Sequence, residues 1–330
     1  MRGPSEIEAS FIAESILCHA ARVAHLPQDE IRETNLFPMN KLINVDGTII
    51  PEKEWTMPKL WSELKTTSNY DARKNLITEF NTQPNNIGRK YRGIACTVVK
   101  YAVGASYRSA LVNIHADGSI QLTHSGTEMG QGINTKVAQA AAYALSKIII
   151  SIEEMKNGKT RTGQSHYYPS AVTNVKSVGV LLNRITISDT STEKLPNMGM
   201  SGGSTTSEAC CGAVMLACDE LVARLIPVRD ELIELKKPYT WDHIIKAANA
   251  SKINLQSSKA WRRGMTKFIQ NDDEKKSHKY VCFGVACSEV EIDCLTGESM
   301  VRRVDILYDC GKPLNPSIDL GQIEGGFVCG

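Results

Sequence analysis

The first part of the chain carries apolar side chains at helical spacing. Ile7 and Phe11 begin an apolar helix face, and Ser5 and Glu8 just before it have the spacing of a capping box. Further helices are predicted at residues 28–35, 55–64 and 70–80. Pro84 and the two asparagines after it break this helical part, and we expect a subdomain boundary there.

After residue 92 the pattern changes to the alternation of apolar and polar positions that is typical of β-strands. Strands are predicted at residues 94–100, 111–115, 119–124, 184–188, 288–293 and 301–308. The turn dipeptides Asp117-Gly118 and Thr296-Gly297 each lie between two of these runs. The sequence therefore predicts two β-hairpins, one in the middle of the chain and one near its end.

Three times, the chain runs through a glycine- or serine-rich turn into a predicted helix. The three loops are residues 126–132, 200–206 and 309–316. A helix N-terminus presents unpaired N–H groups and a partial positive charge, and glycine lets a ligand approach the backbone closely. Such entrances are suited to a phosphate or pyrophosphate group.

Polar residues next to these loops are suited to helix starts. We expect Asn134 to cap the first helix, and Asn315 with Pro316 to form an N-cap and first-turn pair for the third. Thr205 and Glu208 have the spacing of a capping box for the second helix, which is predicted to reach residue 224. One more helix is predicted around residues 241–250.

None of the three loops fits the dinucleotide-binding fingerprint or the P-loop. The sequence thus indicates an anionic ligand that is held by backbone amides and neutral side chains. The neutral side chains in question are Gln131, Ser201, Ser204 and Gln322. Cations are sparse near these loops, and Arg2 is the candidate for that role.

Two polar stretches interrupt the regular pattern. Residues 149–183 contain a polar and aperiodic run that we interpret as a long loop or an insertion. Residues 270–279 form a polar linker between the last predicted helix of the middle region and the second hairpin.

Other reactive side chains have simpler explanations. His115 and His124 lie at strand ends with no evident third metal ligand, and we expect ordinary polar histidines there. The alternating carboxylates Glu289, Glu291 and Asp293 are expected on the solvated face of their strand.

The ten cysteines include no Cys-x-x-Cys pair. Their spacing matches neither a zinc ribbon nor a plant-type iron–sulfur site. We expect free and mostly buried thiols in a reducing compartment. The adjacent Cys210 and Cys211 lie in an apolar helix and are predicted to belong to its core face.

Composition excludes several classes of protein. The chain is 42% hydrophobic and 22% charged with a formal net charge of +2, so nothing favours nucleic acid or a membrane surface as a partner. It shows neither a signal peptide nor an apolar run long enough to span a membrane, and we expect a cytoplasmic location. Its 330 residues would allow about two domains, although the abrupt ends, such as the apolar stretch before Gly330, suggest a piece of a longer protein.

At the glycine-rich loops the sequence resembles the molybdenum hydroxylases, the family of aldehyde oxidase and xanthine dehydrogenase. Gly-Thr-Glu-Met-Gly-Gln-Gly at residues 126–132, followed by Ile-Asn-Thr-Lys-Val-Ala-Gln, is similar to the family's molybdopterin loop. Residues 286–298 and 314–326 are similarly close, and residues 1–4 resemble the motif before a helix of the family. The likeness covers nearly the whole chain apart from residues 149–183.

The resemblance implies an α/β fold of the mixed α+β kind, as a partial molybdopterin-binding domain of the xanthine oxidase type. Residues 1–85 would be the C-terminal part of the first molybdopterin-binding half, and residues 86–330 most of the second, with an atypical insertion at about 149–183. The family's base glutamate would lie beyond Gly330, so no catalytic residue is expected in this chain. Full-length members also bind two [2Fe-2S] clusters and FAD, which this segment would not bind.

The resemblance also implies which residues bind molybdopterin and its molybdenum (Mo). The loop at residues 129–131 would face the cofactor, and the loop at residues 201–205 would cradle its phosphate and molybdenum side. Gln322 would hydrogen-bond the pterin region and Arg2 would lie near the metal centre, with no direct metal ligand in the set. The expected cofactor-binding residues are Arg2, Met129, Gly130, Gln131, Ser201, Gly202, Gly203, Ser204, Thr205 and Gln322.

Two departures from the xanthine enzymes favour an aldehyde oxidase. Pro4 stands where those enzymes carry a phenylalanine, and residues 101–107 lack their Phe-Thr pair. We therefore expect part of an oxidoreductase, homodimeric when full length, that hydroxylates aldehydes to carboxylic acids with water-derived oxygen. Its substrate would be a small aldehyde or N-heterocycle. The alternatives are a xanthine dehydrogenase, which hydroxylates purines, and an inactive fragment that binds cofactor or dimerises.

Overall fold

We describe the protein from a computed structural model. The described residues are 3, 5–36, 50, 52–86, 88–149, 180, 182–196, 199–263 and 280–329. Arg2, Pro4, the predicted linker and most of the predicted insertion at 149–183 lie outside them. The chain divides into two compact units, the first made of Met1–Ala102, Tyr280–Gly311 and Gly330, and the second of Val103–Lys279 and Lys312–Cys329. The predicted boundary between residues 85 and 86 separates the two molybdopterin-binding halves of the family's domain. It is not the boundary between these compact units, and it stays a prediction.

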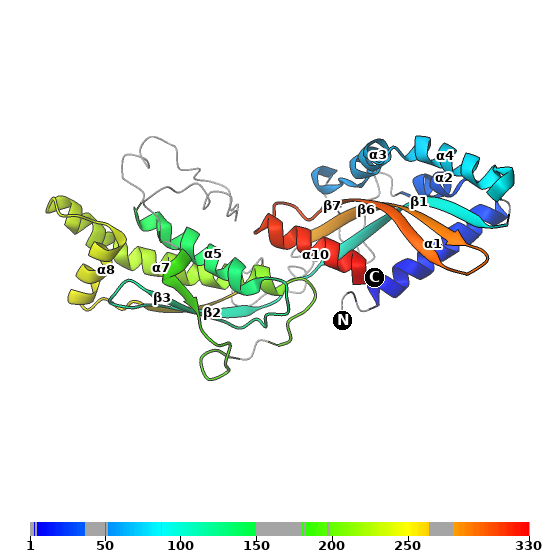
Figure 1. The fold of residues 1–330 in the computed structure, drawn as a ribbon. Helices are drawn as coiled ribbons and strands as arrows, with labels where there is room; N and C mark the ends of the chain where they lie inside the picture. The colour runs from blue at the N-terminus through cyan, green and yellow to red at the C-terminus, as the bar shows by residue number, and fades with distance from the viewer. Residues whose placement is uncertain are drawn as a thin grey trace. The chain divides into compact units, whose positions relative to one another are not determined.

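The first unit is a three-stranded sheet covered by helices (Figure 1). The strands β1 (Lys90–Val103), β6 (Tyr280–Asp293) and β7 (Ser299–Asp309) lie in the order β1-β6-β7, with β6 and β7 antiparallel. The helices are α1 (Glu6–Val23), α2 (Gln28–Asn35), α3 (Met57–Thr67) and α4 (Tyr70–Thr82), with short 3-10 turns at Glu52–Glu54 and Pro84–Asn86. Helix α3 packs on β6 and β7. The core between them includes Trp61, Leu64 and Phe283, and the ring of Trp55 meets that of Phe283 edge-on at 5.2 Å.

The acidic row on β6 does not lie on a solvated face, so that prediction was wrong. Glu291 is 8% exposed, whereas its apolar neighbours Val290 and Ile292 are 44% and 45% exposed. The physical reason is ion pairing: Arg73 on α4 donates to Glu289 at 2.8 Å, and cationic side chains of the sheet itself surround Glu291. Paired carboxylates can be buried because the partners compensate the lost hydration.

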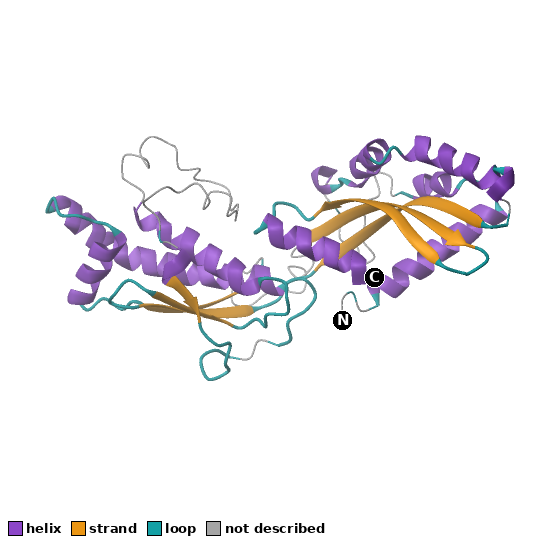
Figure 2. Ribbon diagram, in the orientation of Figure 1, coloured by secondary structure: helices purple, strands orange, loops and turns teal. Residues whose placement is uncertain are grey.

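The second unit is a four-stranded sheet with two long helices on one face (Figure 2). The strand order is β4-β3-β2-β5, formed by β2 (Arg108–Ile114), β3 (Ile120–His124), β4 (Ile185–Ile187) and β5 (Gln256–Trp261). Helix α5 (Ile133–Ser146) packs beside α7 (Thr206–Glu234), and α7 covers β2 and β5. The unit also contains α8 (Trp241–Ala250), α10 (Pro316–Cys329) and 3-10 turns at Lys147–Ile149 and Leu182–Arg184.

The core of the second unit lies between α5, α7 and the sheet. Helix α7 extends ten residues past its predicted end, to Glu234, and contributes the buried Cys210, Cys211 and Cys218. The prediction that the first two are core residues is confirmed. All ten cysteines are free and six of them are buried, as expected. None of the helices among the described residues is long and apolar enough to cross a membrane.

Both predicted hairpins are confirmed. Ile114 pairs with Ile120 across the first turn, and Ile292 pairs with Ser299 across the second. The third helix entrance is also as predicted, because α10 begins at Pro316 and the side chain of Asn315 accepts the N–H of Ile318 at 3.2 Å. Strand β5 was not predicted, since its sequence is largely polar.

The other two predicted capping boxes are confirmed in position but not in hydrogen bonding. Ser5 and Thr205 are the N-cap residues of α1 and α7, but neither Ser5, which has a φ of 71°, nor Thr205 forms a side-chain cap hydrogen bond. The hydroxyl of Thr205 donates back to the carbonyl of Gly202 at 3.1 Å. The carboxylate of Glu208 pairs with Arg263, so a stronger charged partner withdraws it from the expected box.

Candidate functional site

Within the second unit, the first glycine-rich loop contacts both the second loop and helix α10, which follows the third. The backbone N–H of Thr127 in the first loop donates to the Ser201 hydroxyl in the second at 2.8 Å. The side-chain amide of Gln322 on α10 donates to the carbonyl of Gly130 in the first loop at 3.0 Å. Residues that are up to 192 positions apart in the sequence therefore form one cluster around the first loop.

Glu128 caps the helix that follows the first loop. Its carboxylate accepts the backbone N–H groups of Gly130 and Gly132 at 3.0 Å each, and that of Asn134 at 3.1 Å. Helix α5 begins at Ile133 after Gly132, which has a left-handed φ of 70°, so the predicted N-cap at Asn134 was wrong. Glycine takes this conformation without strain, which explains why the helix begins there.

The Glu128 carboxylate changes what this entrance can bind. Burial by itself would raise the pKa of Glu128, but the hydrogen bonds from these backbone N–H groups lower it below its ordinary value. The chain's own anion therefore occupies the amides that we expected to hold a ligand. The signal in the sequence was the glutamate within the glycine-rich motif, and its role as a cap was missed.

The remaining residues of the first loop divide into internal and outward groups. The Gln131 side-chain amide is used inside the loop, where it accepts from the N–H of Met129 at 2.6 Å and donates to the carbonyl of Thr127 at 2.8 Å. The Met129 side chain is 62% exposed. Gly130 has a φ of +95°, and no atom lies within 4 Å of where its Cβ would be. Met129 and Gly130 therefore present an open surface.

His124 joins the base of this loop to α5. Its imidazole is fully buried, and Nδ1 accepts the N–H of Gly126 at 3.3 Å while Nε2 lies 2.8 Å from the Asn134 side-chain oxygen. An accepting Nδ1 requires the neutral ring with its proton on Nε2. Burial lowers the pKa of His124, which favours that neutral form. His124 is thus a buried structural residue of the loop rather than an ordinary strand-end histidine, whereas His115 is exposed.

Arg108 on β2 forms hydrogen bonds with the start of the second loop. This arginine is 2% exposed and donates to the carbonyl oxygens of Gly199 at 3.0 Å and Met200 at 2.5 Å. Further along the loop, Gly203 and Ser204 have φ values of 64° and 59°. No local pattern in the sequence points to Arg108, because its partners are 91 and 92 residues away.

The third entrance brings α10 against the start of α5. A Cβ on Gly132 would lie 2.4 Å from Cδ1 of Ile318, so glycine is required for this close approach. Lys136 and Asp319 approach to 3.4 Å. These contacts place Gln322, which lies one turn beyond Ile318, beside the first loop.

The structure therefore brings together the first loop, Ser201 and Gln322. The other predicted site residues in the second loop, residues 202–205, directly follow Ser201 on the same loop. Arg2 lies outside the described residues. Within the described part of the chain, no group of three or more His, Cys, Asp or Glu side chains could hold a metal ion.

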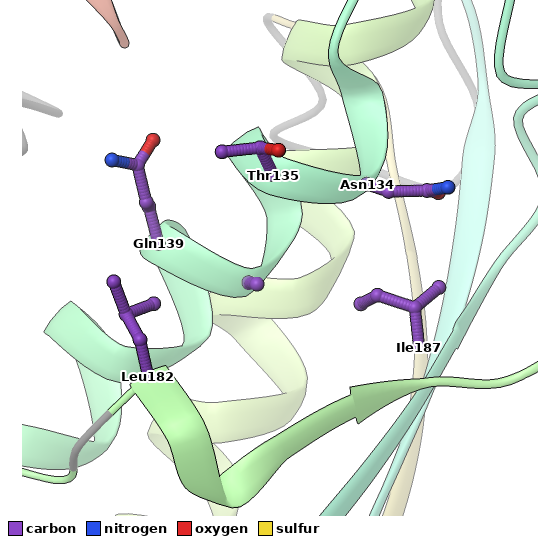
Figure 3. A pocket seen from close by; sticks show the side chains of 6 residues that line it. Asn134, Thr135, Gln139, Leu182 and Ile187 are labelled. Atoms are coloured by element: carbon purple, nitrogen blue, oxygen red, sulfur yellow. The ribbon is translucent and has the colours of Figure 1, made fainter.

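A shallow cavity of about 310 Å³ lies beside this cluster, along α5 (Figure 3). It is lined by Asn134, Thr135, Ala138, Gln139, Leu182 and Ile187. None of the residues predicted to bind the cofactor lines it. Its amide, hydroxyl and apolar side chains carry no charge and do not point to a particular ligand or reaction.

A family model described as a molybdopterin cofactor-binding domain matches residues 63–330. Indole-3-acetaldehyde oxidase of Arabidopsis thaliana is 36% identical over 332 residues, which are 100% of this chain and 22% of that protein. Xanthine dehydrogenase/oxidase of Gallus gallus is 34% identical over 334 residues, 100% of this chain and 21% of that protein. The chain thus spans about a fifth of the length of these relatives.

Solved structures support the same fold. Quinoline 2-oxidoreductase from Pseudomonas putida 86 superposes with a TM-score of 0.68 at 20% identity, covering 96% of this chain and 39% of that one. At such low identity this likeness concerns the fold alone. The matching family model extends over the glycine-rich loops. It shows that the chain belongs to the molybdenum hydroxylases and corresponds to part of their molybdopterin-binding region.

Proposed function

We propose that this chain holds the molybdopterin of an oxidoreductase that hydroxylates aldehydes to carboxylic acids. The observation that carries the proposal is the convergence of the first loop, the second loop and helix α10 in the second unit, through Thr127, Ser201 and Gln322. Family membership supports a molybdenum-dependent oxidoreductase. Beyond this, we propose that the substrates of the oxidoreductase are aldehydes.

The residues present fit a polar, anionic pterin. Gly130, Gly202 and Gly203 have open space where a Cβ would point, so a flat ligand could approach their backbone. The cluster offers neutral hydroxyl and amide donors, and the second loop leads into the start of α7, where an anion is favoured. Within this loop the N–H groups of Gly202 and Thr205 are already used, by the Thr206 hydroxyl and the Gly202 carbonyl. Cofactor would thus contact Met129 and Gly130, the loop at residues 201–205, and Gln322.

The residues of the chain bind and orient, and the cofactor would supply the redox chemistry. When bound, molybdopterin would supply molybdenum and with it the capacity to take up electrons. Gln131 holds the shape of the first loop through its two internal hydrogen bonds and keeps one further N–H for a ligand. Ser201 fixes the spacing between the two loops by accepting the Thr127 N–H.

An aldehyde as substrate is supported by the 36% identity to an indole-3-acetaldehyde oxidase. A purine as substrate is the second candidate, because a xanthine dehydrogenase/oxidase is 34% identical. The departures at Pro4 and residues 101–107 favour the aldehyde. Assaying the complete gene product with an aldehyde and with xanthine separates the two, and turnover of xanthine alone would contradict the proposal.

The cofactor itself can be tested with residues 1–330. We expect the chain, produced in a host that makes molybdopterin, to retain pterin and molybdenum, and a Gln322→Ala variant to retain less. Ligand sites are built from convergent groups, so removing one of them should weaken binding rather than abolish it. A wild-type chain that retains no pterin would contradict the proposal for this segment. Aldehyde turnover by the loaded chain would exclude the alternative of a fragment that only binds.

A further inference from the structure

We propose that Arg108 is a positioning residue of this site, which turns the N–H groups of Met200 and Ser201 outward to the cofactor. The inference rests on the proposed function. It starts from two hydrogen bonds, in which the Arg108 guanidinium holds the carbonyl oxygens of Gly199 and Met200. No part of the sequence motif predicts this contact.

The rigidity of the peptide group transmits the effect of Arg108 to the next residue. The carbonyl of Met200 and the N–H of Ser201 belong to one planar trans peptide and point in opposite directions. Because Arg108 holds that carbonyl toward itself, the Ser201 N–H points away from the buried guanidinium. The carbonyl of Gly199 fixes the direction of the Met200 N–H in the same way.

The charge of Arg108 adds to its geometry. A buried cation bonded to a carbonyl polarises the whole peptide group, and this makes the N–H on its other side a stronger donor. The guanidinium fork can hold both carbonyls at once, which a lysine ammonium cannot do with the same fixed geometry. The side chain is only 2% exposed, so solvent does not screen it fully.

Strand β2 gives Arg108 a rigid base that the first loop shares. The neighbouring Ser109 exchanges hydrogen bonds with Ser125, at 2.9 Å from its N–H to the Ser125 hydroxyl and at 3.0 Å from the Ser125 N–H to its carbonyl. Strand β2 is paired on both sides, by β3 and by β5. Two adjacent residues of one interior strand therefore fix the two loops that the proposed site needs.

The first experiment is hydrogen–deuterium exchange on residues 1–330 without cofactor. In Arg108→Gln we expect the amides of residues 200–205 to exchange about tenfold faster, because a hydrogen bond to a charged group is lost, while those of α5 and of the β2–β3 hairpin keep their rates. Arg108→Lys, which keeps the charge, should lie between the two. Unchanged exchange at 200–205, or an equal rise throughout the second unit, overturns the proposal.

The second experiment measures pterin per chain after production in a molybdopterin-making host. Arg108→Gln should retain several-fold less pterin than wild type. The matched control is Arg229→Gln, a second buried arginine of this unit, 5% exposed, which donates to the carbonyl of Ile148 away from the loops. Equal retention by wild type and Arg108→Gln overturns the proposal. If the wild type itself retains no pterin, the proposed function fails for this segment, and the exchange experiment still decides whether Arg108 orders the loop.

Discussion

Nε2 of the buried His124 imidazole lies 2.8 Å from the side-chain oxygen of Asn134. This hydrogen bond joins the end of β3 to the first turn of α5 and closes the glycine-rich loop at its base. Nδ1 of the same ring accepts the N–H of Gly126, and this second hydrogen bond requires the neutral form of the ring. The loop that would face the cofactor is therefore coupled to the protonation of one buried histidine.

Acid should destabilise the second unit through His124. Its folded-state pKa is lowered below the ordinary 6.5, so the unfolded chain takes up the proton first. The neutral ring contributes fully to the free energy of unfolding above about pH 6.5. This contribution is lost as the pH falls through the lower pKa of the folded state. Urea unfolding at pH 7.5 and pH 5.5 measures this. In His124→Gln the difference in unfolding free energy between the two pH values should shrink. An unchanged difference would show that other groups cause it.

Removing the Glu128 carboxylate should destabilise α5 at its start. Glu128→Ala leaves three backbone N–H groups without their acceptor, and a lost N-terminal cap costs about 1 kcal/mol in the free energy of unfolding. Glu128→Gln should cost less, since it keeps an oxygen acceptor. Denaturant titration measures the effect. The control is Glu231→Ala, at an exposed position of α7, and equal losses in both variants would argue against a special role for Glu128.

Gly132→Ala should weaken the packing of α10 against α5. Alanine at a φ of +70° costs about 1–2 kcal/mol, and its Cβ would meet Ile318 as well. Gly130→Ala has a similar positive φ with open space and should carry only the backbone cost. Adding Ile318→Ala should recover part of the loss in Gly132→Ala. Strict additivity in this double-mutant cycle would show that the two residues do not interact.

Two helical glycines should respond in opposite directions to alanine. A Cβ at Gly212 in α7 would lie 2.4 Å from the Trp261 ring, so Gly212→Ala should destabilise the protein by about 1–3 kcal/mol despite the better helix propensity. Gly321 in α10 has open space, and Gly321→Ala should stabilise by about 0.5–1 kcal/mol. Thermal unfolding of both variants checks the pair, and a loss in both would contradict the steric explanation.

Local patterns predicted the elements of the fold well. The helix at Trp241–Ala250 has the bounds expected from its spacing, and the Asn315–Pro316 pair begins α10 as predicted. The hairpin around Asp117-Gly118 is also confirmed. These features depend on neighbouring residues, because periodicity, turn chemistry and helix starts are encoded within a few positions.

The sequence by itself thus determined the helices, the hairpins and the likeness of the loops to a molybdopterin-binding family. Only the tertiary structure decided which groups those loops leave for a ligand. Glu128 occupies the amides at the start of α5, and Arg108 holds a loop 91 residues away. In the acidic row, Glu289 and Glu291 lie away from solvent because arginines distant in sequence pair with them. Long-range pairing between charges and backbone groups has no local period, so it appears only when the chain is folded.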